Sequence, residues 1–252
     1  MTTEATRARF PWGLTIACAL AFALLCALGV WQVQRMQWKQ GLIAQAETAA
    51  GLLPEAPAYV FGAADPEFSG VALICPGLAS APFVELQSIK EGQAGVRLIS
   101  ACRHPGYGQT VLVDRGFVAD TISARPPVAV SDEPVQLVAE VRATPAPGPM
   151  ALAPEGRRFF ARDNVAMARV LGVEGPTAPW TLFALTSSNP EWQALRPSAP
   201  PAAFSNNHLG YALTWFGLAL ALVGFYIALL RRKPSLRPPR SANETPGKKE
   251  KP

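Results

Sequence analysis

His208 has the clearest potential for chemistry, because it stands where a long uncharged stretch of the chain begins. Asn206 and Asn207 precede it, and asparagine is a good N-cap residue, so a helix is predicted to start there. Tyr211 and Trp215 follow at i+3 and i+7, which places all three side chains on one helix face. An imidazole in this setting suits an axial ligand for a planar apolar cofactor such as haem. The alternative is an interfacial histidine bonded to a loop carbonyl or to water.

The four cysteines and the second histidine provide the other soft ligands of the chain. Cys18 and Cys26 lie inside the first apolar stretch, whereas Cys75 and Cys102 lie in the middle segment. In an oxidising compartment the second pair could form a disulfide between neighbouring strands, and two buried free thiols are the alternative. Cys102-x-His104, with Cys75 nearby, would also suit copper or zinc. The Pro-Gly-Tyr-Gly sequence that follows His104 favours a plain surface turn instead.

Other motifs with catalytic meaning are missing from the sequence. It contains no HExxH, CxxC, P-loop lysine or GxSxG, and the GxG at Gly106 and Gly108 lacks the strand-turn-helix context of a dinucleotide site. Asp114 and Arg115 on a predicted strand could be an acid and a guanidinium at a site. Adjacent side chains of a strand point to opposite faces, however, so a structural ion pair with some other residue is favoured. With two histidines, no nucleophile and base can be paired. The sequence therefore predicts a protein that is not an enzyme and has no catalytic residue.

Two uncharged apolar stretches lie near the ends of the chain. Each is long enough for the ~20 helical residues that a hydrocarbon core of ~30 Å requires. Transmembrane helices are therefore predicted over residues 12–34 and 208–230. A cleaved signal peptide is the alternative for the first, but its apolar stretch is longer than signal peptides usually have. Aromatic residues lie near the ends of both stretches, as expected at membrane interfaces: Trp12, Trp31, Trp38, Tyr211, Trp215 and Tyr226.

The charge distribution predicts the orientation. The tail, residues 231–252, is strongly basic, and the positive-inside rule places it in the cytoplasm. With two spans, the N-terminal residues 1–11 lie on the same side and the middle segment, residues 35–207, lies outside. That segment has slightly more acidic than basic residues, which argues against nucleic acid as a partner. The tail is predicted to be disordered and to face membrane lipid.

The middle segment is predicted to form one β-rich domain of α+β type with its own core. Residues 35–50 continue the first span as an amphipathic helix. Six segments with strand signals, each bounded by Gly or Pro, are predicted to be strands, at 69–75, 82–89, 96–101, 110–118, 135–143 and 180–186. Helical spacing predicts a helix at 162–171. Small residues are expected where the two spans approach each other: Ala17, Ala21 and Ala27 on the first, and Gly217, Ala221 and Gly224 on the second.

Three stretches of the sequence resemble the SURF1 family of cytochrome c oxidase assembly proteins. Residues 206–216, Asn-Asn-His-Leu-Gly-Tyr-Ala-Leu-Thr-Trp-Phe, are similar to the family's signature at the second span. Residues 28–32, Leu-Gly-Val-Trp-Gln, with Arg35 and Trp38-Lys39, are similar to its pattern at the end of the first span. Residues 111–118 resemble its central strand, although the family commonly has Asn and Trp where this chain has Asp114 and Phe117.

The resemblance implies a function and a place in the cell. It implies an assembly factor or chaperone of the inner (plasma) membrane, with both termini cytoplasmic and the central domain periplasmic. Its expected partners are the catalytic subunit of cytochrome c oxidase, which holds haem a and copper, and a haem a synthase. In bacterial relatives haem a binding is attributed to a histidine that matches His208.

The resemblance also implies a set of site residues around His208. Tyr211, Trp215, Trp31 and Arg35 are the expected neighbours of a haem a whose iron is bound by His208, and Arg35 or Lys39 would meet its propionates. Two other interpretations stay open. One is a membrane scaffold without a cofactor, and the other is a copper-handling factor that uses Cys75, Cys102 and His104.

Overall fold

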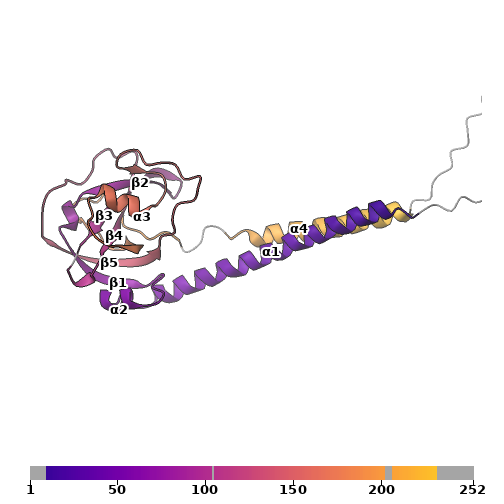
Figure 1. The fold of residues 1–252 in the computed structure, drawn as a ribbon, viewed down its shortest axis with the longest axis horizontal. Helices are drawn as coiled ribbons and strands as arrows, with labels where there is room; N and C mark the ends of the chain where they lie inside the picture. The colour runs from indigo at the N-terminus through magenta and orange to yellow at the C-terminus, as the bar shows by residue number, and fades with distance from the viewer. Residues whose placement is uncertain (1–9, 104, 202–205, 232–252) are drawn as a thin grey trace, which may run out of the picture. The chain divides into compact units, whose positions relative to one another are not determined.

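The computed structural model of the chain describes residues 10–103, 105–201 and 206–231. The chain forms two compact units. One contains Met1–Trp38 together with Asn206–Pro252, and the other is Lys39–Ser205. The first unit is a pair of helices and the second is a domain built on one β-sheet (Figure 1). Two apolar helices near the ends of the chain therefore flank a mixed sheet, as the sequence predicts.

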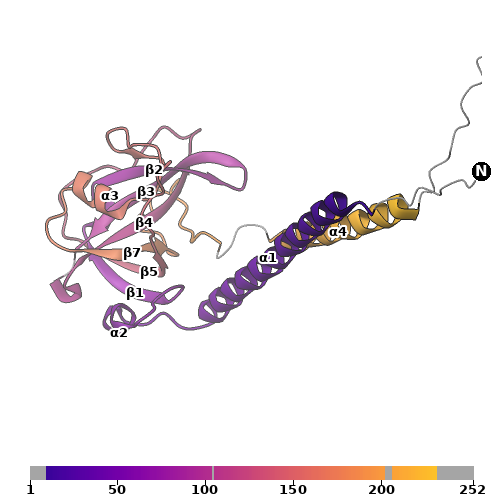
Figure 2. The same cartoon turned by 45° about the vertical axis from the view of Figure 1, so that its right-hand side comes forward.

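The helix pair consists of α1, Trp12–Ala50, and α4, His208–Arg231. Both are long and apolar enough to cross a membrane. α1 runs without a break from the predicted first span through the predicted amphipathic segment to Ala50. The two helices lie side by side and antiparallel (Figures 1 and 2), because Thr15 Oγ1 is 2.7 Å from Tyr226 OH at one end and Gln32 meets His208 near the other.

The line of contact between the helices differs from the predicted one. Gly29 and Gln32 are the buried residues of α1, and Ala212 and Ala219 are those of α4. A Cβ atom on Gly29 would lie 2.6 Å from a ring carbon of Phe216, so glycine is needed for this approach. The expected small residues are all exposed: Ala17, Ala21, Ala27, Gly217, Ala221 and Gly224. That prediction was wrong, since small residues occur on every face of both helices and composition alone does not select one.

The sheet has seven strands in the order β1-β5-β7-β4-β3-β2-β6. Pairing is antiparallel except between β4 and β7 and between β2 and β6. The six predicted strands are all present, and the two-residue β6 is too short to leave a sequence pattern. The strands are β1 Gly70–Pro76, β2 Phe83–Lys90, β3 Gln93–Cys102, β4 Thr110–Ala119, β5 Pro134–Ala143, β6 Arg158–Phe159 and β7 Thr177–Ala184.

Short helices complete the domain. α3, Asn164–Val170, confirms the predicted helix, and the side chain of Asp163 caps it by accepting a hydrogen bond from Ala166 N. α2, Pro57–Gly62, was missed because proline favours a loop. Pro57 occupies the first helical turn, where proline is tolerated. Two 3-10 turns, η1 at Leu78–Ser80 and η2 at Pro105–Tyr107, lie in the connections.

β4 lies in the middle of the sheet and is buried along its whole length. Its successive side chains point to opposite faces of the sheet and so pack into different hydrophobic clusters. Val111 and Val113 pack into the cluster formed with β1, β5 and β7, whereas Leu112 packs with Met167 of α3 and residues of β2 and β3. The central strand therefore positions residues on both faces of the sheet.

A disulfide joins Cys75 of β1 to Cys102 of β3, with 5.4 Å between their Cα atoms. These strands are not neighbours, because β5, β7 and β4 lie between them in the sheet. The expectation of a bond between neighbouring strands was therefore wrong. The sheet curls strongly enough to bring the end of its edge strand β1 against the end of β3.

Candidate cofactor site on the helix pair

His208 is held by a hydrogen bond to a residue of the other helix. Its Nδ1 lies 2.6 Å from Oε1 of Gln32, whose side chain is buried between the helices. His208 itself is half-buried. Because a glutamine oxygen only accepts hydrogen bonds, the contact selects the imidazole tautomer with its proton on Nδ1. The second ring nitrogen, Nε2, is then the one with a lone pair for a metal ion.

Further contacts hold the two helices together next to this pair of side chains. Asn206 Nδ2 donates to the carbonyl oxygen of Met36, one turn beyond Gln32 on α1. On the other side, Gly29 admits the ring of Phe216. Tyr211 N donates to Asn207 O, which closes the first turn of α4. These contacts set α4 against α1 and so keep His208 opposite Gln32.

The two aromatic residues predicted to share a face with His208 remain accessible. Tyr211 is 59% exposed, and Trp215 is half-buried one turn further along α4. An apolar ring ligand could therefore lie against them without displacing packed protein. The three side chains form one continuous surface on the first two turns of α4.

Trp31 and Arg35 lie on an exposed face of α1. Trp31 is 53% exposed, and Arg35 is exposed with its guanidinium carbon 3.9 Å from the centre of the Trp38 ring. These residues share a face of α1 that differs from the one presenting Gln32 to α4. The predicted role of Arg35 with propionates gains no support from this geometry.

Gln32 is the site residue that sequence reasoning missed. It stands inside the quoted family pattern, next to the more conspicuous Trp31. The signal was its spacing: Gly29, Gln32 and Met36 follow one another at intervals of three and four, which is the seam of a helix pair. A polar amide at such a position between two apolar helices has a defined partner and often a function.

A second polar cluster lies in the sheet domain around Asp114. This carboxylate is fully buried and receives Arg97 Nε at 2.7 Å and Arg162 Nη2 at 2.6 Å. The predicted structural ion pair of Asp114 is thus confirmed, with two arginines. The adjacent Gly116 donates its N–H to the same carboxylate, and its φ of +136° together with its contact to Arg196 O restricts the position to glycine.

Arg115 behaves differently from its neighbour. It is the extra residue at a break in the register between β3 and β4, and it is fully buried. Its guanidinium donates to Ser188 Oγ and to Ala79 O rather than to a carboxylate. The expected ion pair of Arg115 was therefore wrong, and burial lowers the pKa of this guanidinium to about 10. Arg115 joins the loops at Ala79 and Ser188 to the central strand.

The described residues do not assemble a copper site. Cys75 and Cys102 are bonded to each other, so their sulfurs are not thiolates. Within residues 10–103, 105–201 and 206–231, no three His, Cys, Asp or Glu side chains are grouped as metal ligands. His104 lies outside the described residues.

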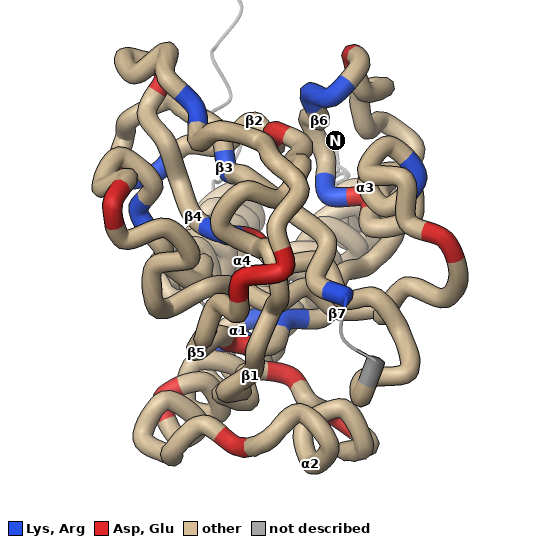
Figure 3. The backbone as a smooth tube through the Cα atoms, turned by 90° about the vertical axis from the view of Figure 1, so that its left-hand side faces the viewer, with Lys and Arg blue, Asp and Glu red and all other residues tan. Residues whose placement is uncertain are grey.

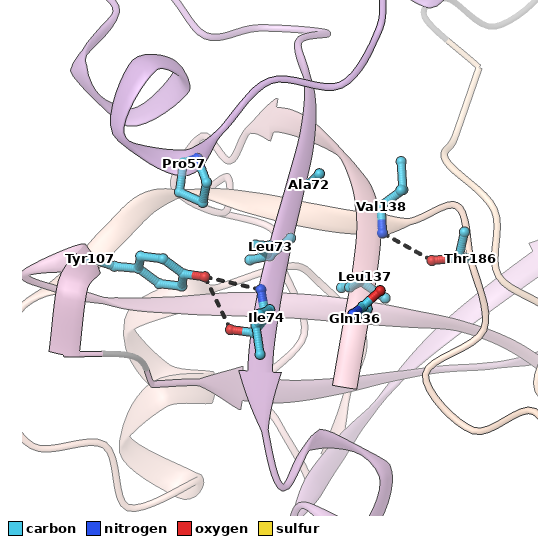
Figure 4. A pocket seen from close by; sticks show the side chains of 9 residues that line it. All are labelled: Pro57, Ala72, Leu73, Ile74, Tyr107, Gln136, Leu137, Val138 and Thr186. Atoms are coloured by element: carbon cyan, nitrogen blue, oxygen red, sulfur yellow. Dashed lines mark hydrogen bonds between the residues drawn. The ribbon is translucent and has the colours of Figure 1, made fainter. Parts of the chain in front are cut away.

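A cavity of about 550 Å³ opens over β1 and β5 (Figure 4). Most of its wall is apolar, and the hydroxyl of Tyr107 is hydrogen-bonded to both the N–H and the carbonyl of Ile74. Burial raises the pKa of Tyr107. This tyrosine fastens η2 to the edge strand, so its hydroxyl is committed to structure rather than to a ligand.

Charges of both signs are distributed over the sheet domain. On the side shown in Figure 3, basic and acidic positions are mixed along the tube rather than gathered into one basic face. A nucleic-acid site needs such a face. The middle segment therefore keeps the mixed charge expected from its sequence.

Comparison with known proteins places the chain among its relatives. The model of the SURF1 family matches residues 19–220. Surfeit locus protein 1 of Homo sapiens is 29% identical over 236 residues, which cover 83% of this chain and 74% of that protein. The protein of the same name from Mus musculus is 28% identical, covering 83% and 72%, and that from Takifugu rubripes is 26% identical, covering 88% and 97%. The matched region covers α1 from Ala19 onward, the whole sheet domain and α4 up to Leu220, and the chain belongs to the SURF1 family.

Proposed function

We propose that this protein is an assembly factor for cytochrome c oxidase that binds haem a through His208 and supports its insertion into the catalytic subunit. Membership of the SURF1 family supports the assembly role. The observation that carries the haem proposal is the 2.6 Å contact between His208 Nδ1 and Gln32 Oε1. Metal-binding histidines almost always donate their other ring nitrogen to an oxygen acceptor in this way.

The donor set around His208 fits haem a. One imidazole nitrogen provides the iron ligand, and the exposed ring of Tyr211 and the half-buried ring of Trp215 offer apolar surface beside it. Haem a brings the redox-active iron that the oxidase needs. Residues of this chain would hold that iron, fix the orientation of the imidazole and leave the isoprenoid tail in lipid, where its transfer from water is favourable.

The same proposal includes an orientation in the membrane. The basic tail favours a cytoplasmic C-terminus, and a helix pair then places the N-terminus on the same side and the sheet domain outside. The disulfide of the sheet domain supports an oxidising compartment such as the periplasm. His208, at the start of α4, would then lie at the outer face of the inner membrane, where a haem a synthase would supply the cofactor.

Cells that lack this protein provide the test. After complementation with His208→Ala, we expect the oxidase catalytic subunit to contain several-fold less haem a than after complementation with the wild type. His104→Ala makes the same change at the second histidine and should restore wild-type haem content. If His208→Ala restores full haem content, the protein acts without this ligand, as a scaffold. If His104→Ala alone fails, copper handling replaces haem binding.

Gln32 should be required for tight haem binding although it touches no haem atom in this proposal. Loss of the partner that orients a metal-binding histidine typically weakens metal affinity by about 10- to 100-fold. Gln32→Ala should therefore lower haem a affinity by that factor, measured by titration of the purified protein. Gln34→Ala removes an exposed glutamine of the same helix and should leave affinity unchanged. Equal affinities of the two variants would contradict the orienting role.

A further inference from the structure

A second cavity of the sheet domain, of about 510 Å³, has two arginines in its wall. Arg97 and Arg162 line it, and both contact Asp114 behind them. The guanidinium carbons of both arginines also lie over the ring of Phe183, at 5.4 Å and 4.7 Å from its centre. A buried carboxylate and an aromatic ring therefore hold two cationic groups at one place in the cavity wall.

The positive charge of this cluster is not fully compensated. Asp114 supplies one negative charge to two guanidinium groups. Lys90 and Glu91 also line the cavity, and their opposite charges offset each other. One positive charge is thus in excess among the described residues of the cavity, and a cavity with low-dielectric walls strengthens its field.

The two arginines differ in how many of their hydrogen-bond donors have an acceptor. Each guanidinium nitrogen of Arg97 has an acceptor, since Nε donates to Asp114, Nη1 to the hydroxyl of Ser198 and Nη2 to its carbonyl. Arg162 donates Nη2 to Asp114, but its buried Nη1 has no acceptor among the described residues. Desolvation by burial, only partly opposed by Asp114, lowers the pKa of Arg162. A charged N–H group left in this state costs free energy until an acceptor reaches it.

Apart from Ser88 and Ser198, the rest of the lining is apolar. Leu86, Ile89, Phe183, Pro200 and Pro201 contribute most of it. Cavities of this volume hold small organic molecules, with a few polar groups that fix their orientation. One excess positive charge and one unused donor match a monoanion better than a phosphate dianion.

We infer that this cavity binds a small amphiphilic carboxylate, with its carboxylate group on Arg162 and its apolar body against Phe183 and the prolines. The site involves neither His208 nor the helix pair, so it stands apart from the haem proposal. A charge-assisted hydrogen bond from Arg162 gives the selectivity for the anion.

The test is isothermal titration calorimetry of the full chain in lipid nanodiscs with 4-phenylbutanoate, using empty nanodiscs as the blank. The wild type should bind this carboxylate at least about tenfold more tightly than the neutral 4-phenylbutanamide, which is the effect of roughly one charged hydrogen bond. Arg162→Gln should lose that preference. Arg125→Gln removes an arginine that pairs with Glu85 outside this cavity and should retain it.

Arg162→Lys distinguishes loss of the binding site from loss of folding. The ammonium can still pair with Asp114, yet it lacks the second nitrogen of the guanidinium fork, so this variant should fold and show a weaker preference for the carboxylate. Three results would overturn the inference: no binding of 4-phenylbutanoate by the wild type, equal affinity for the carboxylate and the amide, or an unchanged preference in folded Arg162→Lys.

Discussion

Asp114→Ala should destabilise the sheet domain by about 3–5 kcal/mol, the range found when one partner of a buried ion pair is removed. The change leaves Arg97 and Arg162 close together without their shared carboxylate, and both guanidinium groups are largely buried. Both guanidinium groups also lie over the ring of Phe183. The free energy of unfolding of the purified chain, measured by urea unfolding with pulse proteolysis, tests this.

Glu85→Ala is the matched control for this prediction. Glu85 also pairs with an arginine, Arg125, at 2.5 Å, but both side chains are more than one-fifth exposed. Partly exposed pairs contribute about 1 kcal/mol or less. A cost for Asp114→Ala no larger than that for Glu85→Ala would contradict the central role of the buried cluster.

Removal of the disulfide should have an effect of comparable size. Cys75 and Cys102 are separated by 27 positions, and closing a loop of that length stabilises the folded state by about 3.5 kcal/mol in the chain-entropy model. The double variant Cys75→Ser/Cys102→Ser should therefore unfold at lower urea concentration than the wild type. Reductant should lower the midpoint of the wild type and leave that of the variant unchanged.

The two cysteines of α1 provide the control for this experiment. Cys18 and Cys26 are free thiols on the helix pair. Cys18→Ser/Cys26→Ser should leave the unfolding of the sheet domain and its response to reductant as in the wild type. A wild-type midpoint that does not respond to reductant would show that the bond does not contribute to the stability of the domain.

The strands could be predicted from sequence because each is a short alternating or apolar segment between Gly and Pro residues. β4 shows the limit of that reasoning. Its pattern predicts a strand, but the partners of Asp114 come from Arg97 and Arg162, which are far from it in sequence. The curl that brings Cys75 to Cys102 also depends on the pairing order of all the strands. Long-range pairing of this kind leaves no local signal.

The candidate site was predicted in part. His208 stood out because a histidine at the start of an apolar helix is conspicuous, whereas its partner Gln32 is one of several uncharged polar residues near the end of α1. The small residues at the helix contact were predicted wrongly for the same reason, because several similar residues occur along each helix. Gly29 is required because Phe216 lies against it, and only the antiparallel register of the two helices brings that pair together.

The most direct test of the central claim is the absorption spectrum of the purified protein during titration with haem a. The wild type should show a saturable Soret band of histidine-ligated haem, and His208→Ala should lose that band or bind at least about 100-fold more weakly, since loss of the ligand exceeds loss of its hydrogen-bond partner. An unchanged band and affinity in His208→Ala would show that haem a is not held by this residue.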